Sequence, residues 1–189
     1  MMHVMRASEL IGLPVVSIAI GEDIAEIRDV VYDGEAHRLI GFTLNKRGIF
    51  AGRMSDVLPC EGISSIGADA VMVIDETAIT DSASPSTLER SGQARSVIGN
   101  RVMSADGRVL GEVVEVIIAT GTNAAAVGYE ITPTDGSGQA FMPISAQMAL
   151  SDENLIVPTE ATQFIRNDLA GFGAAVTDFR KSNLERGTT

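Results

Sequence analysis

The stretch VIGNRVMSADGRVLGEVVEVII, from Val97 to Ile118, decides the fold because its pattern of residues occurs twice in the chain. LIGLPVVSIAIGEDIAEIRDVVY, from Leu10 to Tyr32, follows the same plan. Each stretch opens with an apolar pair and a glycine, continues as a short strand pattern, and turns at acidic or glycine residues. A longer strand pattern follows, in which a glutamate precedes apolar and acidic residues. An internal repeat of this kind predicts two copies of one fold.

The correspondence between the two copies keeps its order along most of the chain. Differences in length between the copies fall in presumed turns, which tolerate insertions better than strands do. The matched pairs include Gly12/Gly99, Val15/Val102, Ile27/Val113, Val30/Val116, Gly41/Gly128, Phe42/Tyr129, Pro59/Pro143, Ile66/Leu150, Val71/Leu155 and Val73/Val157.

Each copy has the pattern of several short strands. EIRDVVY and GEVVEVIIA are rich in valine and isoleucine, with the alternation of half-buried strands. Asp106-Gly107 predicts a two-residue hairpin turn with positive φ at both positions, and Asp33-Gly34 repeats the signal. Short strands at close spacing without long helices between them indicate small barrels. The predicted fold class is mainly β: two tandem small antiparallel β-barrels with a C-terminal helical tail.

We place the first barrel at residues 5–76 and the second at residues 96–158. Residues 77–95 have the serine-, alanine- and proline-rich composition of a linker. The remaining residues, 159–189, form the tail. Thr159 is a candidate cap for a helix that starts at Glu160.

The tail carries a seam of apolar residues at alternating spacings of four and three, which is typical of a helix with one buried face. The seam residues are Ile165, Leu169, Phe172, Val176 and Phe179. Gly171 and Gly173 weaken a helix, so the tail is either one helix or two short helices bent at AGFG. The seam covers the chain's own barrels or mates with a second copy, and we favour the homodimer.

Composition narrows the class of partner. The formal charge of −11 and the scarcity of clustered Lys and Arg disfavour binding to nucleic acid. Apolar residues make up 45% of the chain, which is ample for a core, but no run approaches the ~20 residues that span a bilayer. A single cysteine, Cys60, suits a reducing compartment. With no signal-peptide pattern at the N-terminus, we expect a cytoplasmic protein without an integral membrane segment.

The second copy resembles the PRC-barrel family, the small barrel of the photosynthetic reaction-centre H subunit and of RimM. The residues that carry the resemblance are Ile98-Gly99, Asp106-Gly107, Leu110-Gly111-Glu112-Val113, Gly128, Pro143-Ile144 and Leu155-Ile156-Val157. The first copy matches through Leu10-Ile11-Gly12, Glu26-Ile27, Asp29-Val30, Gly41-Phe42, Pro59 and Val71-Met72-Val73. The resemblance implies an interaction module. It implies neither catalytic residues nor a cofactor.

The sequence has no combination of residues that is typical of a catalytic or metal-binding site. Asp33, Glu35 and His37 alternate, but Asp33 begins the predicted turn, so we expect no metal site there. Cys60 follows a proline, as its counterpart Ile144 does, which predicts a buried, inert thiol. We therefore expect no enzymatic activity and no cofactor.

Acidic residues at matching positions are the remaining candidates for a functional surface. They are Glu26, Asp29, Glu112 and Glu115. They either form an interaction face together with the tail seam or are the solvated side of amphipathic strands. We predict a non-enzymatic adaptor that binds proteins, of unknown identity, through its barrels. The alternative is a protein that binds a small ligand or metal in a cleft between the barrels.

Overall fold

The computed structural model describes residues 2–33, 36–46, 52–81, 97–122 and 124–186. The chain divides into two compact units. The first-repeat unit comprises Arg6–Ala94 together with Thr120–Ala125. The second-repeat unit comprises Met1–Met5, Arg95–Ala119 and Ala126–Thr189. Each repeat is thus the body of one unit and is completed by a short segment that lies elsewhere in the sequence.

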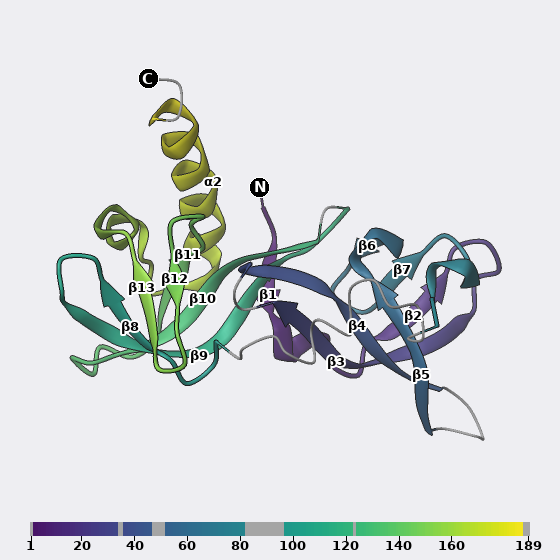
Figure 1. The fold of residues 1–189 in the computed structure, drawn as a ribbon. Helices are drawn as coiled ribbons and strands as arrows, with labels where there is room; N and C mark the ends of the chain where they lie inside the picture. Colours follow the sequence, from purple (N-terminus) through teal and green to yellow (C-terminus); the bar gives the residue numbers. More distant parts are fainter. Residues whose placement is uncertain (1, 34–35, 47–51, 82–96, 123, 187–189) are drawn as a thin grey trace. The chain divides into compact units, whose positions relative to one another are not determined.

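The first-repeat unit is built on a six-stranded sheet with the order β5-β4-β3-β2-β7-β6 (Figure 1). Its strands are β2 (Pro14–Ser17), β3 (Asp23–Asp33), β4 (Arg38–Lys46), β5 (Gly52–Pro59), β6 (Ile63–Ile66) and β7 (Val71–Val73). Short 3-10 helices occupy Ala7–Leu10, Cys60–Gly62 and Glu76–Ala78. The fully buried hydrophobic side chains of this unit, which include Leu10, Ile27, Phe42, Leu44 and Leu58, are aliphatic apart from one phenylalanine.

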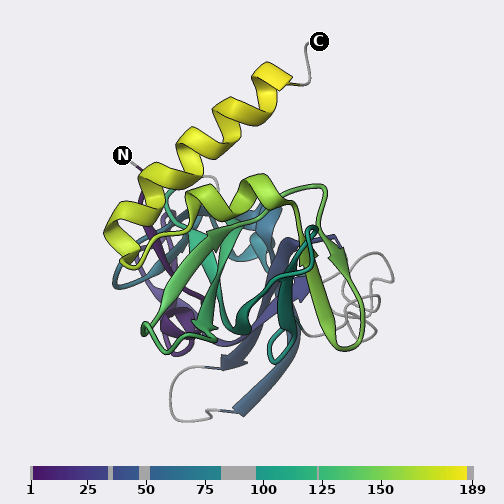
Figure 2. The same cartoon turned by 90° about the vertical axis from the view of Figure 1, so that its left-hand side faces the viewer.

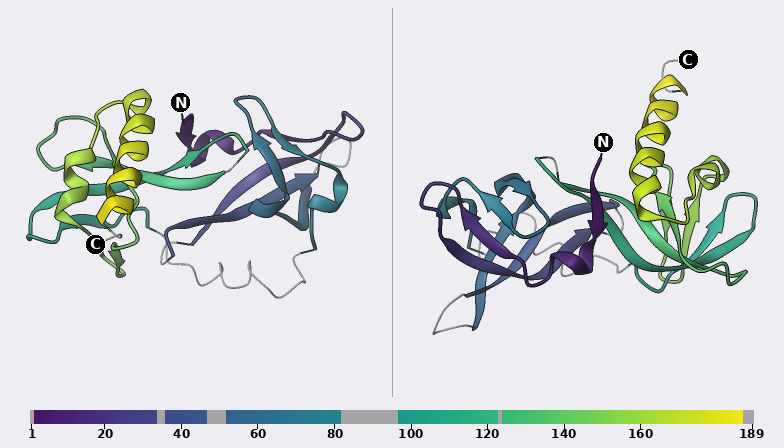
Figure 3. Two further views of the ribbon diagram at one scale, coloured as in Figure 1. Left: turned by 90° about the horizontal axis from the view of Figure 1, so that it is seen from above. Right: turned by 180° about the vertical axis from the view of Figure 1, so that it is seen from behind.

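The second-repeat unit has a seven-stranded sheet with the order β11-β10-β9-β8-β13-β12, and β1 pairs with β9. Its strands from β8 onward are coloured teal to yellow-green in Figure 3. Its strands are β1 (Val4–Arg6), β8 (Arg101–Ser104), β9 (Val109–Ala119), β10 (Ala125–Pro133), β11 (Ala140–Pro143), β12 (Ala149–Leu150) and β13 (Asn154–Val157). A 3-10 helix at Thr159–Phe164 and the helix α2 (Leu169–Arg186) follow the last strand.

The two sheets share one pattern of strand pairing, so the mainly β class with tandem barrel-like repeats is confirmed. Gly41 lies opposite Pro59 in one sheet, and Gly128 lies opposite Pro143 in the other. The extra residue of the first copy lies in its first turn, because Ser17 N–H donates to Glu22 O whereas Ser104 N–H donates to Arg108 O. The repeat seen in the sequence is therefore a repeat of hydrogen-bond register.

Two details of the sheets differ from the prediction. One pair in each sheet is parallel: β2 with β7, where Val15 faces Val71, and β8 with β13, where Val102 faces Leu155. The hairpin at Asp106-Gly107 has a three-residue loop in which Gly107 alone has positive φ, at 89°. This is the geometry of a type I turn followed by a left-handed glycine. Gly34 and Glu35, which belong to the second predicted turn, lie outside the described residues.

The tail forms a single α-helix after a break, rather than a helix that starts at Glu160. Thr159–Phe164 is a 3-10 helix, and α2 begins only at Leu169. The Asp168 carboxylate accepts a hydrogen bond of 2.6 Å from Gly171 N–H, which caps α2 at its first turn. AGFG therefore opens the helix instead of bending it. The predicted linker, residues 77–95, lies largely outside the described residues.

The 3-10 helix and α2 lie together against the second-repeat sheet at β11 (Figure 2). Phe172 and Val176 of α2 enter a buried cluster with Ile117 and Phe141, and the partly buried Met2 packs against that cluster. Gly173 lies so close to Met2 that an added Cβ would be 2.6 Å from the Met2 carbonyl oxygen. The glycines that weaken the helix in the sequence therefore allow close packing in the structure.

Candidate functional site

The acidic pair Asp29 and Glu115 has a local structural role that is the same in both repeats. The Asp29 carboxylate accepts a 2.8 Å hydrogen bond from the backbone N–H of Val30. The Glu115 carboxylate accepts one of the same length from Val116 N–H. The ladder between β3 and β4 shifts register between Ile27 and Asp29, which marks a bulge. In each repeat the acid thus accepts a hydrogen bond from the backbone N–H of the next residue in its own strand.

The other acidic pair lies on strands at equivalent register. Glu26 faces Pro14 across β2 and β3, and Glu112 faces Arg101 across β8 and β9. Glu26 is half-buried, whereas Glu112 is exposed. The two glutamates therefore sit in different surroundings although the backbone places them alike.

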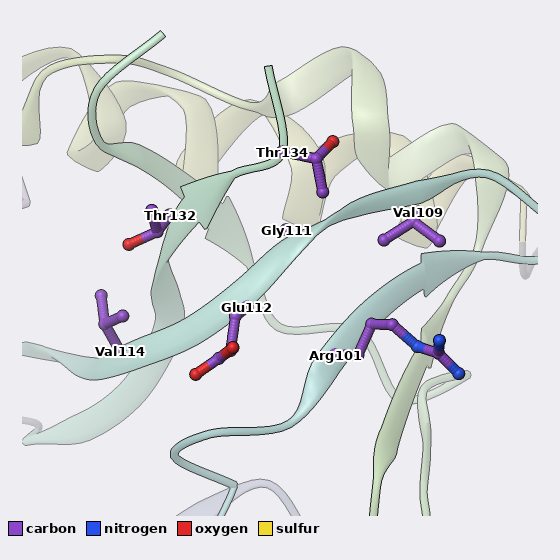
Figure 4. A pocket seen from close by; sticks show the side chains of 7 residues that line it. All are labelled: Arg101, Val109, Gly111, Glu112, Val114, Thr132 and Thr134. Carbon is purple, nitrogen blue, oxygen red and sulfur yellow. The ribbon is translucent and has the colours of Figure 1, made fainter. Parts of the chain in front are cut away.

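Glu112 lies in an open groove of about 400 Å³ on the outer face of the second-repeat sheet (Figure 4). The groove is lined by Arg101 from β8, by Val109, Gly111, Glu112 and Val114 from β9, and by Thr132 and Thr134 from β10 and its end. An added Cβ at Gly111 would collide with the Thr132 carbonyl oxygen. The absence of that Cβ lets β9 and β10 approach closely at the floor of the groove.

The chemistry of the groove is mixed. Val109 and Val114 retain 40% and 42% of their exposure, which is high for valines in strands. Arg101 is held in place because its Nε donates to Asn154 Oδ1 at 3.0 Å, while its backbone N–H donates to Glu153 O. The groove therefore offers apolar surface, threonine hydroxyls and one charge of each sign. This combination suits a polypeptide segment, which has both apolar side chains and a polar backbone.

The first repeat has different side chains at the two valine positions of this groove. At the positions of Val109 and Val114 it has Asp23 and Arg28, according to the shared register. Arg28 Nε donates to Thr43 Oγ1 at 3.2 Å, so this side chain lies across the equivalent face. The outer faces have diverged while the buried positions have kept their apolar character.

The tail residues that we proposed as an interaction surface are largely used inside the chain. Phe172, Val176 and Phe179 are buried, whereas Ile165 and Leu169 are half-buried. The Phe172 ring centroid is 5.9 Å from that of Phe141, and the Phe179 ring meets Phe164 edge-on at 5.0 Å. These contacts place the aromatic part of the seam against the second-repeat sheet and the 3-10 helix.

Cys60 is half-buried, not fully buried as we expected, because it opens the 3-10 helix at the end of β5. Its Sγ donates to the Leu39 carbonyl oxygen at 3.6 Å. Desolvation, with a smaller contribution from the neighbouring Glu61 carboxylate, raises the pKa of the Cys60 thiol to about 12. A thiol with such a pKa holds almost no thiolate at neutral pH, and the thiolate is the nucleophilic form.

We expect Cys60 of the native protein to react with a disulfide reagent at pH 8 on the order of 1,000-fold more slowly than an ordinary thiol. The factor follows from a pKa three units higher than the ordinary 9.0. Absorbance at 412 nm with Ellman's reagent measures the rate, and the chain unfolded in urea is the control. Equal rates for native and unfolded protein would show that the thiol is not protected.

Of the alternating residues Asp33, Glu35 and His37, Asp33 binds the backbone and Glu35 lies outside the described residues. Asp33 accepts a hydrogen bond from Ala36 N–H at 3.0 Å and lies 3.7 Å from Arg38. His37 is buried, with a positive φ of 51°. Within the described ranges, no group of three or more His, Cys, Asp or Glu side chains is placed to hold a metal ion.

Sequence reasoning missed a set of exposed isoleucines. Ile11 and Ile98 precede the equivalent glycines Gly12 and Gly99, which have φ of 88° and 89°, and both isoleucines are about half exposed. Ile18, Ile20 and Ile74 of the first repeat are also exposed. For Ile11, Ile20 and Ile98 the available signal was the glycine that follows each of them, because such a position in a turn does not need a buried side chain.

A comparison with protein-family models identifies the class of protein to which the first repeat belongs. Residues 2–79 match the PRC-barrel domain. The chain therefore carries a PRC-barrel domain, in agreement with the resemblance drawn from the sequence. The matched segment is the first repeat, whereas the likeness of the second repeat rests on the strand registers that the two sheets share. In the described part of the chain, no helix has the length and apolarity to cross a membrane.

Proposed function

We propose that this chain is a non-enzymatic adaptor and that the groove on the second-repeat sheet binds a segment of a partner protein. The observation that supports this function most directly is the exposed pair Val109 and Val114 beside an oriented Arg101. Apolar side chains left in water on a strand face cost free energy unless a partner covers them. An oriented guanidinium adds a charge-assisted hydrogen-bond donor for a carboxylate or carbonyl of that partner.

The comparison of the two repeats strengthens the proposal. Both sheets have the same register, so the scaffold alone does not require valine at the two groove positions. The first repeat folds with Asp23 and Arg28 there. The open, shallow form of the groove fits an extended or helical segment better than a small metabolite, which enclosed pockets surround on most sides.

Replacing both valines by glutamate, V109E/V114E, should abolish the capture of groove partners from a lysate of the native host. Two added carboxylates beside Glu112, with Arg101 as the one positive charge that lines the groove, would oppose any apolar contact. The control is I156E, which places one glutamate at another exposed apolar residue of the same sheet, outside the groove. Quantitative mass spectrometry of the captured proteins compares the three chains.

The decisive result is a protein that wild type and I156E retain at least tenfold better than V109E/V114E does. If V109E/V114E recovers all captured proteins as wild type does, the groove does not bind them and the proposal is wrong. Thermal unfolding followed by circular dichroism checks that both variants remain folded, which their exposed positions allow.

A further inference from the structure

Three exposed isoleucines lie at one end of the paired strands β2 and β7 in the first-repeat unit. Both segments continue their parallel pairing past the strand ends. Ile18 N–H donates to Val73 O at 2.9 Å, and Ala19 N–H donates to Ile74 O at 3.0 Å. Ile18 and Ile20 are each 54% exposed, and Ile74 is 61% exposed. We call these three residues the isoleucine patch.

Acidic residues flank the isoleucine patch on both segments. Glu22 and Asp23 follow Ile20 and Gly21, and Asp75 and Glu76 follow Ile74. Hydrogen bonds from Thr77 to the Asp75 carboxylate lower the pKa of that group, so Asp75 is charged at neutral pH. Neither contributing stretch, residues 7–27 or residues 60–81, contains a lysine or an arginine. The patch is therefore apolar at its centre and negative at its rim.

The second repeat shows that the fold does not require this arrangement. Ala105 N–H donates to Val157 O at 2.8 Å, which makes Ala105 the equivalent of Ile18 and Pro158 the equivalent of Ile74. The turn of residues 105–107 has the sequence Ala-Asp-Gly.

The rim is largely lost in the second repeat. Arg108 replaces Glu22, Val109 replaces Asp23 and Thr159 replaces Asp75, whereas Glu160 keeps the acid of Glu76. The apolar centre and three of the four rim acids are thus present together in one copy and absent together in the other.

We propose that the isoleucine patch docks a basic amphipathic segment of a partner protein, with its apolar side on the isoleucines and its lysines or arginines toward the acidic rim. Charge complementarity selects this occupant. A second copy of the chain would bring another acidic rim, and the formal charge of −11 opposes that approach. An anionic lipid surface is opposed for the same reason. The patch lies in a different unit from the groove, so the inference does not depend on the proposed groove function.

A designed peptide tests the proposal directly. The probe is an 18-residue amphipathic helix of leucine and lysine with a fluorescein label, and fluorescence anisotropy measures its binding to the full chain. The I18S/I74S variant should bind at least tenfold more weakly than wild type. The E22Q/E76Q variant should bind at least threefold more weakly, and its binding should depend less steeply on salt.

Two controls separate docking from unspecific attraction to an acidic protein. A peptide with the same lysines and serine in place of leucine should bind at least tenfold more weakly to wild type. I11S, which removes an exposed isoleucine outside the patch, should leave binding unchanged. Equal binding of the two peptides, or undiminished binding by I18S/I74S with an unchanged circular dichroism melt, overturns the proposal. Self-association of wild type that I18S/I74S abolishes would overturn the stated occupant in favour of a second copy.

Discussion

A chain that ends at Pro158 is expected to lose the cooperative unfolding transition of the second-repeat unit. The truncation removes Phe172, Val176 and Phe179, which are buried in the full chain, and exposes Phe141. Loss of one buried phenylalanine side chain costs about 3–5 kcal/mol. Two phenylalanines and a valine together therefore approach the whole stability of a domain, which is about 5–15 kcal/mol.

Urea unfolding followed by circular dichroism, together with binding of the dye ANS, measures this effect. The control chain ends at Ser182, which retains all of the seam and removes only the last residues of α2 and those after it. We expect the control to unfold with the midpoint of the full chain. A chain that ends at Pro158 and still unfolds cooperatively without binding ANS would show that the tail is not part of the second-repeat core.

The substitution Gly128→Ala is expected to destabilise the protein by roughly 1–3 kcal/mol through overpacking. A Cβ at this position would overlap the Phe172 ring, and it would lie 2.5 Å from the Met142 carbonyl oxygen. Real Cβ atoms do not approach other heavy atoms so closely, so the tail helix or the β10–β11 pair must shift. Urea midpoints of the variant and the wild type measure the change in free energy of unfolding.

Two further variants locate the cause of that loss. Gly67→Ala is the control, because a Cβ there would make only an ordinary contact of 3.4 Å with Ala70 O, and we expect a change within about 0.5 kcal/mol. In a double-mutant cycle with Phe172→Leu, part of the Gly128→Ala cost should disappear, since the smaller side chain vacates part of the overlap. Strict additivity of the two changes would mean that Gly128 does not make room for Phe172.

The interaction surfaces were predictable from the sequence only in part. Matching acids in the two repeats drew attention to Asp29 and Glu115, but their hydrogen bonds to Val30 N–H and Val116 N–H give them a local role at the strand backbone. Glu112 was singled out by the same pattern and does line the groove. The pattern could not separate the two cases, because both kinds of acid recur at fixed spacing on a strand.

The isoleucine patch was missed for a related reason. Isoleucine beside a strand pattern predicts a buried strand residue, and only the register of β2 with β7 shows that Ile18 and Ile74 lie beyond the strand ends. Composition could not reveal either that Ala105 and Pro158 take the places of Ile18 and Ile74 in the second repeat. That contrast depends on knowing which residues of the two repeats are structurally equivalent.

The sequence by itself determined the two-copy plan, the mainly β class and the positions of the strands. Those features depend on local chemistry: the alternation of side chains along a strand, glycine at positive φ in Gly12 and Gly99, and the order of the matched residues. Tertiary structure decided what covers each apolar face. Periodicity shows that the tail has an apolar seam, but the occupant of that seam depends on contacts between residues far apart in the sequence. In this chain those contacts bring Phe172 to Phe141, Gly173 to Met2 and β1 to β9, and Phe172, Val176 and Phe179 of the seam are buried within the chain. The homodimer stays a prediction.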